Sequence, residues 1–85
     1  MDIEPTRSLA SEFQSIDARG LKCPLPVLHA RRALTRLAPG GRVEVLCTDP
    51  VSVIDIPHLA QEMGFSIVET EHQNGEYRFV IGPPA

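Results

Sequence analysis

Aromatic residues and long apolar runs are scarce in this chain, and both absences limit what it can be. The 85 residues contain no tryptophan, one tyrosine and three phenylalanines, so we expect a core of mainly aliphatic side chains. No apolar stretch approaches the ~20 residues that a membrane-spanning helix needs. The first residues carry neither the basic start nor the apolar block of a signal peptide. We therefore expect a cytoplasmic protein without a membrane segment.

Cysteine is also scarce, since the chain has only Cys23 and Cys47. Two cysteines in a short chain without a secretion signal predict free thiols in a reducing compartment, and not a disulfide framework. Neither cysteine has a second cysteine or a histidine at the spacing typical of zinc ligands. The sequence therefore predicts no metal site and no cofactor.

Acidic residues outnumber basic ones, and the formal net charge is −3. This balance argues against a protein that binds nucleic acid directly through its whole surface. With 42% hydrophobic and 22% charged residues, the chain has the composition of one ordinary globular domain. The charge is uneven, however. Six of the eight basic residues lie between positions 18 and 43, a span that has no Asp or Glu and that includes Cys23: Arg19, Lys22, Arg31, Arg32, Arg36 and Arg42.

Hydrophobic periodicity predicts short strands alternating with helices. Strands are expected at 15–18 and 42–48, and a hairpin at 65–82, where Asn74 and Gly75 suit a two-residue turn that needs positive φ twice. A helix beginning near residue 24 carries an apolar stripe of Val27, Ala30, Leu34 and Leu37. The order β-α-β-α-β-β predicts an α/β two-layer sandwich, in which a mixed four-stranded sheet carries both helices on one face. We expect one domain at 13–82, with a flexible N-terminal tail at 1–12 and a short C-terminal tail at 83–85.

The second helical region, after residue 49, contains an internal proline. Asp49 followed by Pro50 is typical of a helix cap and first turn. Pro57 would interrupt a long helix, because it lacks a donor and disfavours helical dihedrals in the residue before it. We therefore predict a short helical turn at 50–54 and a second start with Asp55 as its cap. Ile56, Leu59, Ala60 and Met63 follow at the spacing of a helix that packs one face on a core.

The segment around Cys23 reads LKCPLPVLHARRAL, from residue 21 to residue 34. If the helix starts at Pro24, both Pro24 and Pro26 lie in its first turn, where backbone N–H groups have no helical partner. Leu25 and Val27 would keep free donors there. Cys23 would then be the cap or its neighbour, with its sulfur at the positive end of the helix dipole. A helix N-terminus with nearby cations lowers a cysteine pKa from ~8.5 into the range ~3.5–7.5. With Arg19 and Lys22 close by, the sequence predicts a rigid, exposed and electropositive thiolate.

Several alternatives stay open at this point. Cys23 has no second cysteine in a Cys-x-x-Cys pair, and His29, six residues on, is badly placed as its base. The thiol therefore suits carrying a group better than closing a disulfide, although it could also be an incidental small residue. Cys47 is expected to be a core thiol, with a redox role beside Cys23 as the alternative. The arginines of the first helix form either an ordinary solvated face or a docking surface for an acidic partner: Arg31, Arg32 and Arg36.

Two motifs resemble the TusA-type (SirA-like) sulfur carriers. They are DARGLKCPLPV at 17–27, with Cys-Pro-x-Pro at the start of a helix, and TDPVSVIDIP at 48–57. The resemblance implies the same sandwich fold and a persulfide on Cys23, with a carrier function and not that of a stand-alone enzyme. It implies that Pro24, Pro26, Gly20, Arg19 and Lys22 shape the site, and that Asp49 and Asp55 cap the second helix.

The same resemblance implies particular partners. The sulfur donor would be a cysteine desulfurase or a rhodanese-type protein, and the acceptor another protein. The pathway would be tRNA thiolation, sulfur oxidation or cofactor synthesis. A shuttling carrier of this kind is expected to be a monomer. The competing hypothesis is a non-catalytic interaction module that keeps the same fold and in which the thiol is incidental.

Overall fold

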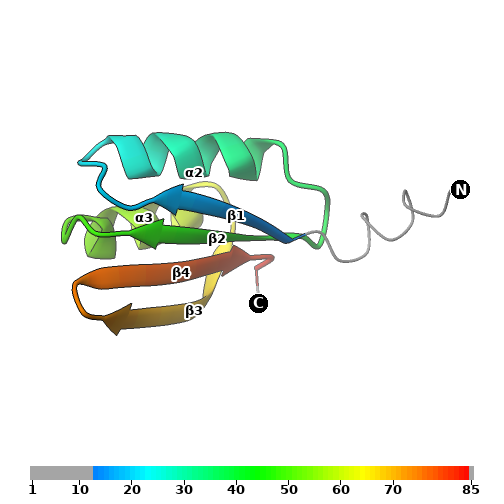
Figure 1. Ribbon diagram of the computed structural model, residues 1–85. Coiled ribbons are helices and arrows are strands. Elements are labelled where there is room, and N and C mark those ends of the chain that lie inside the picture. The colour runs from blue at the N-terminus through cyan, green and yellow to red at the C-terminus, as the bar shows by residue number, and fades with distance from the viewer. Residues whose placement is uncertain (1–12, 85) are drawn as a thin grey trace, which may run out of the picture.

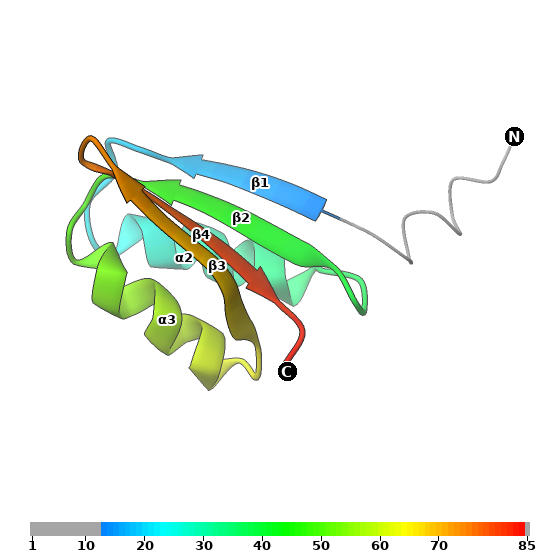
Figure 2. The same cartoon turned by 90° about the horizontal axis from the view of Figure 1, so that it is seen from below.

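Four strands form one mixed sheet, and two helices cover one of its faces (Figures 1 and 2). The computed structural model describes residues 13–84, so the predicted N-terminal tail at 1–12 lies outside the described residues. The strand order is β1-β2-β4-β3, with β1 parallel to β2 and the other neighbours antiparallel. The predicted fold class is confirmed. The elements are β1 (Phe13–Ala18), α2 (Leu25–Thr35), β2 (Arg42–Cys47), α3 (Ser52–Glu62), β3 (Ser66–Gln73) and β4 (Glu76–Gly82).

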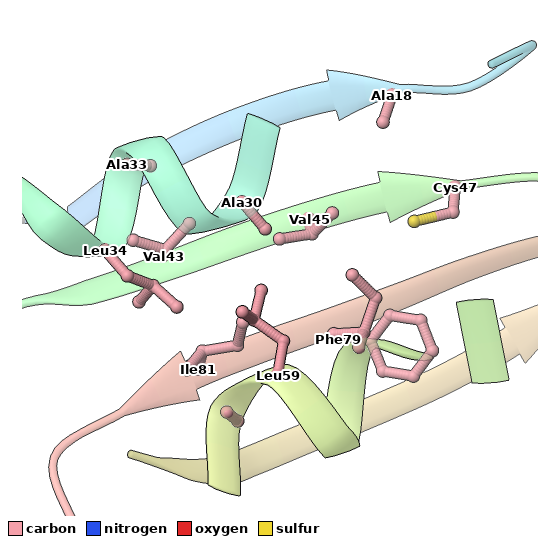
Figure 3. Packing of buried hydrophobic residues seen from close by; sticks show 12 residues of the cluster. Ala18, Ala30, Ala33, Leu34, Val43, Val45, Cys47, Leu59, Phe79 and Ile81 are labelled. Atoms are coloured by element: carbon pink, nitrogen blue, oxygen red, sulfur yellow. The ribbon is translucent and has the colours of Figure 1, made fainter. Parts of the chain in front are cut away.

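The core lies between the sheet and the helices, where alternate strand residues meet the apolar stripes of α2 and α3 (Figure 3). On β2 the inward residues are Val43, Val45 and Cys47, all fully buried. Phe79 of β4 is the largest fully buried side chain, and it faces the same interior. One buried phenylalanine among aliphatic neighbours is the kind of core that the shortage of aromatic residues predicts.

The hairpin between β3 and β4 forms as expected. Asn74 and Gly75 have φ values of 54° and 78°, so both central residues of the turn adopt the positive φ that this turn type needs. His72 pairs with Tyr77 and Glu71 with Arg78, as a two-residue loop at Asn74 and Gly75 requires. The rings of His72 and Tyr77 stack with centroids 4.2 Å apart.

The stripe predicted on the first helix is confirmed. Ala30 and Leu34 of α2 are buried, and Val27 and Leu37 pack against the core while partly exposed. Ala33, which the prediction left out, is buried as well.

The prediction of two helical starts around Pro57 is wrong, because α3 is a single helix with Pro57 inside it. The backbone N–H groups of Ser52 and Val53 donate to the carbonyls of Asp49 and Pro50, and these bonds start the helix well before the proline. Pro57 has no N–H, so the carbonyl of Val53, four residues earlier, lacks its helical donor. Val53 is 46% exposed, so solvent can replace the missing donor.

Within residues 13–84 nothing covers the other face of the sheet, which carries a charged cluster centred on Arg78. This guanidinium forms ion pairs with Glu44 of β2 and with Glu69 and Glu71 of β3. The bond from Arg78, followed by the bond from the Ser15 hydroxyl, holds the pKa of the Glu44 carboxyl below its ordinary value. The contact of Glu71 with Arg78 across the hairpin is therefore one part of a larger cluster.

Candidate functional site

Cys23 lies where the loops that follow two parallel strands run side by side. Ala18 and Cys47, the last residues of β1 and β2, are register partners, so both strands end at the same edge of the sheet. The loops after them are at the same end of the molecule, on the left in Figure 1. The N–H of Gly20 donates to the Thr48 hydroxyl (2.8 Å), and the N–H of Cys23 donates to Oδ2 of Asp49 (2.7 Å). The parallel pairing thus holds the cysteine loop against the start of α3.

The helix begins one residue later than predicted, so both prolines lie one position nearer its N-terminal end. Pro24 is the cap position of α2 and only Pro26 lies in its first turn, while the peptide bond between Cys23 and Pro24 is cis. The expectation that Leu25 keeps a free donor is wrong, because its N–H donates to the carbonyl of Lys22 (2.8 Å). Residues 22–25 close a turn that presents Cys23 at the surface.

The Cys23 thiol contacts a carboxylate and not a cation. Its Sγ donates to Oδ2 of Asp55, 3.3 Å away. This hydrogen bond, followed by partial desolvation and by the charges of Asp55 and Asp49, raises the pKa of the Cys23 thiol. The predicted electropositive thiolate is therefore wrong for the protein without a partner.

The basic residues expected beside the sulfur have other partners. Arg19 pairs with Asp17 (2.9 Å) and lies 3.6 Å from Glu76, so its charge is directed along the sheet edge. The Arg19 guanidinium lowers the pKa of Asp17 to about 2. Lys22 lies close enough to Asp49 to favour that carboxylate electrostatically.

Asp49 accepts hydrogen bonds from backbone N–H groups of both the cysteine loop and the loop before α3. Its Oδ2 accepts the N–H of Cys23, and its Oδ1 accepts the N–H of Val51 at the cap position of α3 (3.1 Å). These two backbone hydrogen bonds hold the pKa of the Asp49 carboxyl below its ordinary value. Asp49 is not the cap residue that the sequence predicts, because the cap position of α3 is Val51 and has no side-chain cap bond; Asp49 instead ties the residue at that position to the cysteine loop. The capping role predicted for Asp55 is wrong, because Asp55 lies within the first turn of α3 and faces Cys23.

A narrow crevice separates the N-terminal ends of α2 and α3. Its lining residues come from both helices and from the turn between β2 and α3: Cys23, Pro26, Val27, Asp49, Ser52 and Asp55. Sequence reasoning assigned Asp49 and Asp55 only to their own helix and missed that they contact Cys23, Asp49 at the backbone and Asp55 at the thiol. The available signal was that both follow the second strand of a β-α-β unit, because consecutive strands of such a unit usually lie side by side.

Exposed apolar side chains surround this end of the molecule. They lie in the first turns of the two helices or just before them, and the sequence analysis did not single them out as a surface. Ile54 is 72% and Leu28 50% exposed, and Leu25 and Val51 are also exposed. Large apolar side chains exposed together around a reactive group are typical of a protein-binding surface.

The predicted arginines of α2 lie on its exposed face. All three line a shallow groove with Leu28 and Thr35, and Arg31 also pairs with Glu62 of α3 at 3.2 Å. His29 and His58 are exposed, and the thiol's hydrogen bond goes to Asp55 and to neither histidine.

Cys47 is fully buried in the core, as predicted, and both cysteines are free thiols. Burial raises the pKa of the Cys47 thiol, which makes it unreactive. Within residues 13–84 no three His, Cys, Asp or Glu side chains gather as a potential metal site. In the same residues no helix has the length and apolar character to cross a membrane.

A profile of the family described as "Sulfurtransferase TusA" matches residues 14–82, which include the cysteine loop, both helices and all four strands. This chain belongs to the TusA family. It is 38% identical over 73 residues to "Sulfur carrier protein TusA" of Allochromatium vinosum, covering 86% of this chain and 96% of that one. It is 39% identical over 66 residues to the protein of the same name in Pseudomonas aeruginosa, covering 78% of this chain and 84% of the relative.

A solved SirA-like structure agrees with the fold. The crystal structure of a SirA-like protein from Desulfitobacterium hafniense superposes with a TM-score of 0.75 at 35% sequence identity. The match covers 85% of this chain and 99% of the other. The family resemblance drawn from the two motifs is therefore confirmed.

Proposed function

We propose that this protein is a sulfur carrier that accepts a sulfane sulfur as a persulfide on Cys23 and relays it to an acceptor protein. The observation that carries the proposal is the exposed Cys23 thiol at the tip formed by two helix ends, with the other described cysteine buried in the core. Such a thiol can hold a sulfur atom without a neighbouring cysteine to displace it as a disulfide. The relatives named as sulfur carriers support the same reading.

The transfer is a pair of thiol exchange steps. The Cys23 thiolate attacks the terminal sulfur of a donor persulfide, the donor's S–S bond breaks, and the donor thiolate takes up the proton that Cys23 lost. In the second step an acceptor thiolate attacks the terminal sulfur on Cys23. Cys23 then leaves as the thiolate and is reprotonated, so no electrons are gained or lost overall.

The proposed partners are proteins. A cysteine desulfurase or a rhodanese-type protein would donate the sulfur, and the acceptor would serve tRNA thiolation, sulfur oxidation or cofactor synthesis in the cytoplasm. These assignments rest on the family resemblance. The exposed apolar side chains at the starts of the two helices, Leu25, Leu28, Val51 and Ile54, support protein partners.

The exposed arginines of α2 share a groove with Leu28 and extend this apolar surface into a docking surface for an acidic partner. Changing Arg32 and Arg36 together to glutamate is expected to weaken binding of a donor desulfurase by about tenfold, because like charges then face each other across the interface. Binding is measured by calorimetry at two salt concentrations. The control is Arg42→Glu, which changes an exposed arginine at the start of β2. Equal affinity of the double variant and the wild type at low salt would show that this face is only solvated.

The test of the proposed function is the intact mass of the protein under non-reducing conditions. After incubation with a cysteine desulfurase and cysteine, or with a rhodanese and thiosulfate, we expect a gain of one sulfur atom. Reductant should remove it, and peptide mapping should place it on Cys23. No gain with either donor would favour the alternative function, an interaction module whose surface binds partners without carrying sulfur.

A further inference from the structure

Asp55 faces the reactive thiol in a way that the carrier chemistry does not by itself require. Its Oδ2 accepts a hydrogen bond from Sγ of Cys23 at 3.3 Å, and Asp49 brings a second carboxylate to the backbone of the same residue. A carboxylate at this distance stabilises the neutral thiol and opposes the thiolate. The thiolate is the form that attacks a persulfide or an electrophile. The site therefore contains a feature that suppresses its own nucleophile.

The charges around Cys23 leave Asp55 without a cation of its own. In the cysteine loop, the charge of Lys22 stabilises the Asp49 carboxylate, and Arg19 is paired with Asp17 and Glu76. Arg31 of α2 pairs with Glu62, at the far end of α3 from Asp55. Within residues 13–84 no lysine or arginine forms an ion pair with Asp55. The exposed neighbour Ile54 places this carboxylate beside the surface that a partner would cover.

We propose that Asp55 keeps the Cys23 thiol protonated while the protein is free, and that a partner activates it by placing a lysine or arginine against Asp55. This inference rests on the proposed carrier function and concerns its control. In a complex, the cation pairs with the carboxylate of Asp55. The carboxylate then accepts the thiol proton less strongly and repels the thiolate less. The sulfur is then nucleophilic where a partner is docked and unreactive elsewhere. Such a carrier resists stray alkylation and oxidation between partners.

The first test concerns the free protein and does not depend on sulfur transfer. The rate at which iodoacetamide alkylates Cys23 is measured from pH 6 to 10 for the full chain and for Asp55→Asn. The variant should react about threefold faster near pH 7, and its pH profile should move to lower pH. A tenfold rise in thiolate gives only about a threefold rise in rate, because a less basic thiolate is also less nucleophilic. Glu71→Gln, which removes an equal charge from the uncovered sheet face, should leave the profile unchanged.

Identical profiles for the wild type and Asp55→Asn would overturn the proposal. Circular dichroism checks that the variant is folded, and Asp55→Ser provides a second variant if asparagine disturbs α3. A mere structural role for Asp55 would alter the melting temperature without shifting the pH profile of alkylation.

The second test separates the free thiol from the docked one. Loading of Cys23 is followed by mass spectrometry with glutathione persulfide and, separately, with a desulfurase as donor. Asp55→Asn should load faster than the wild type from glutathione persulfide and no faster from the desulfurase, because the protein donor already neutralises Asp55. Slower loading of Asp55→Asn from both donors would instead show that Asp55 accepts the thiol proton in the reaction, and the proposal would then be wrong. If neither donor loads the wild type, the proposed carrier function fails, while the alkylation profiles still decide the role of Asp55.

Discussion

Cys23→Ser is expected to abolish sulfur loading completely and to leave the fold unchanged. A hydroxyl oxygen cannot form the persulfide, so no residual transfer through this position is expected. Cys23 is exposed and its structural contact is made by its backbone N–H, which serine keeps. The mass assay with a desulfurase or a rhodanese measures the loss, and a thermal melt measures the stability of the variant.

The matched control for this variant is Cys47→Ser, which makes the same atomic change in the core. Cys47 is 0% exposed, so a hydroxyl there should destabilise the protein by roughly 1–3 kcal/mol. Sulfur loading should nevertheless persist in the folded fraction. Loading that survives in Cys23→Ser but is lost in Cys47→Ser would reverse the assignment of the two thiols. Loss in both variants would show that the cysteines act together.

Asp49→Ala is expected to slow sulfur transfer by about tenfold or more while Cys23 itself is intact. Asp49 joins the two loops of the site through Cys23 and Val51, and alanine removes both acceptors. The cysteine loop then loses its fixed position relative to α3, and misplacement of a reacting atom by about 1 Å can cost ~100-fold in rate. Single-turnover transfer from the desulfurase is the measurement. An unchanged rate would mean that the turn at residues 22–25 is rigid without Asp49.

Asparagine at position 49 should have an intermediate effect. The carboxylate uses separate oxygens for its two backbone donors, whereas an asparagine offers only one. The depressed pKa of Asp49 also predicts a pH dependence. Its contribution to stability is complete above the unfolded-state pKa of ~3.9 and is lost as the pH falls through the lower folded-state pKa. Thermal melts of the wild type and Asp49→Ala should therefore converge in acid, with the alanine variant showing the flatter pH dependence.

Local patterns were enough to predict most of this fold. The Asn74–Gly75 turn needs only two residues that tolerate positive φ, and it fixes the register of β3 on β4. The stripe through Ala30 and Leu34 is a property of helix geometry alone. Pro57 misled the prediction, because the rule against internal prolines takes no account of exposure. Val53 is exposed, so water can donate to its carbonyl in place of the proline.

The electrostatic character of the site could not be predicted in the same way. Nearness in sequence suggested that Arg19 and Lys22 would act on Cys23, yet the chain turns Arg19 toward Asp17 and Glu76. Asp55, 32 positions away, supplies the contact instead. That contact belongs to the tertiary structure, because it forms only when the pairing of β1 with β2 brings their two following loops together. The sequence identified the nucleophile, and only the structure shows what opposes its ionisation.

The cluster of Arg78 on the uncovered sheet face bears on how this protein behaves when it is concentrated. Stacking two such faces would strip water from Glu44, Glu69, Glu71 and Arg78 together, and desolvating charges is costly even when they are paired. Self-association through the bare sheet is therefore disfavoured. At the thiol end, by contrast, Leu28 and Ile54 are exposed and offer an apolar surface to a partner. For the proposed sulfur carrier, the charged sheet face thus disfavours dimers formed by stacked sheets and leaves the thiol end to meet partner proteins.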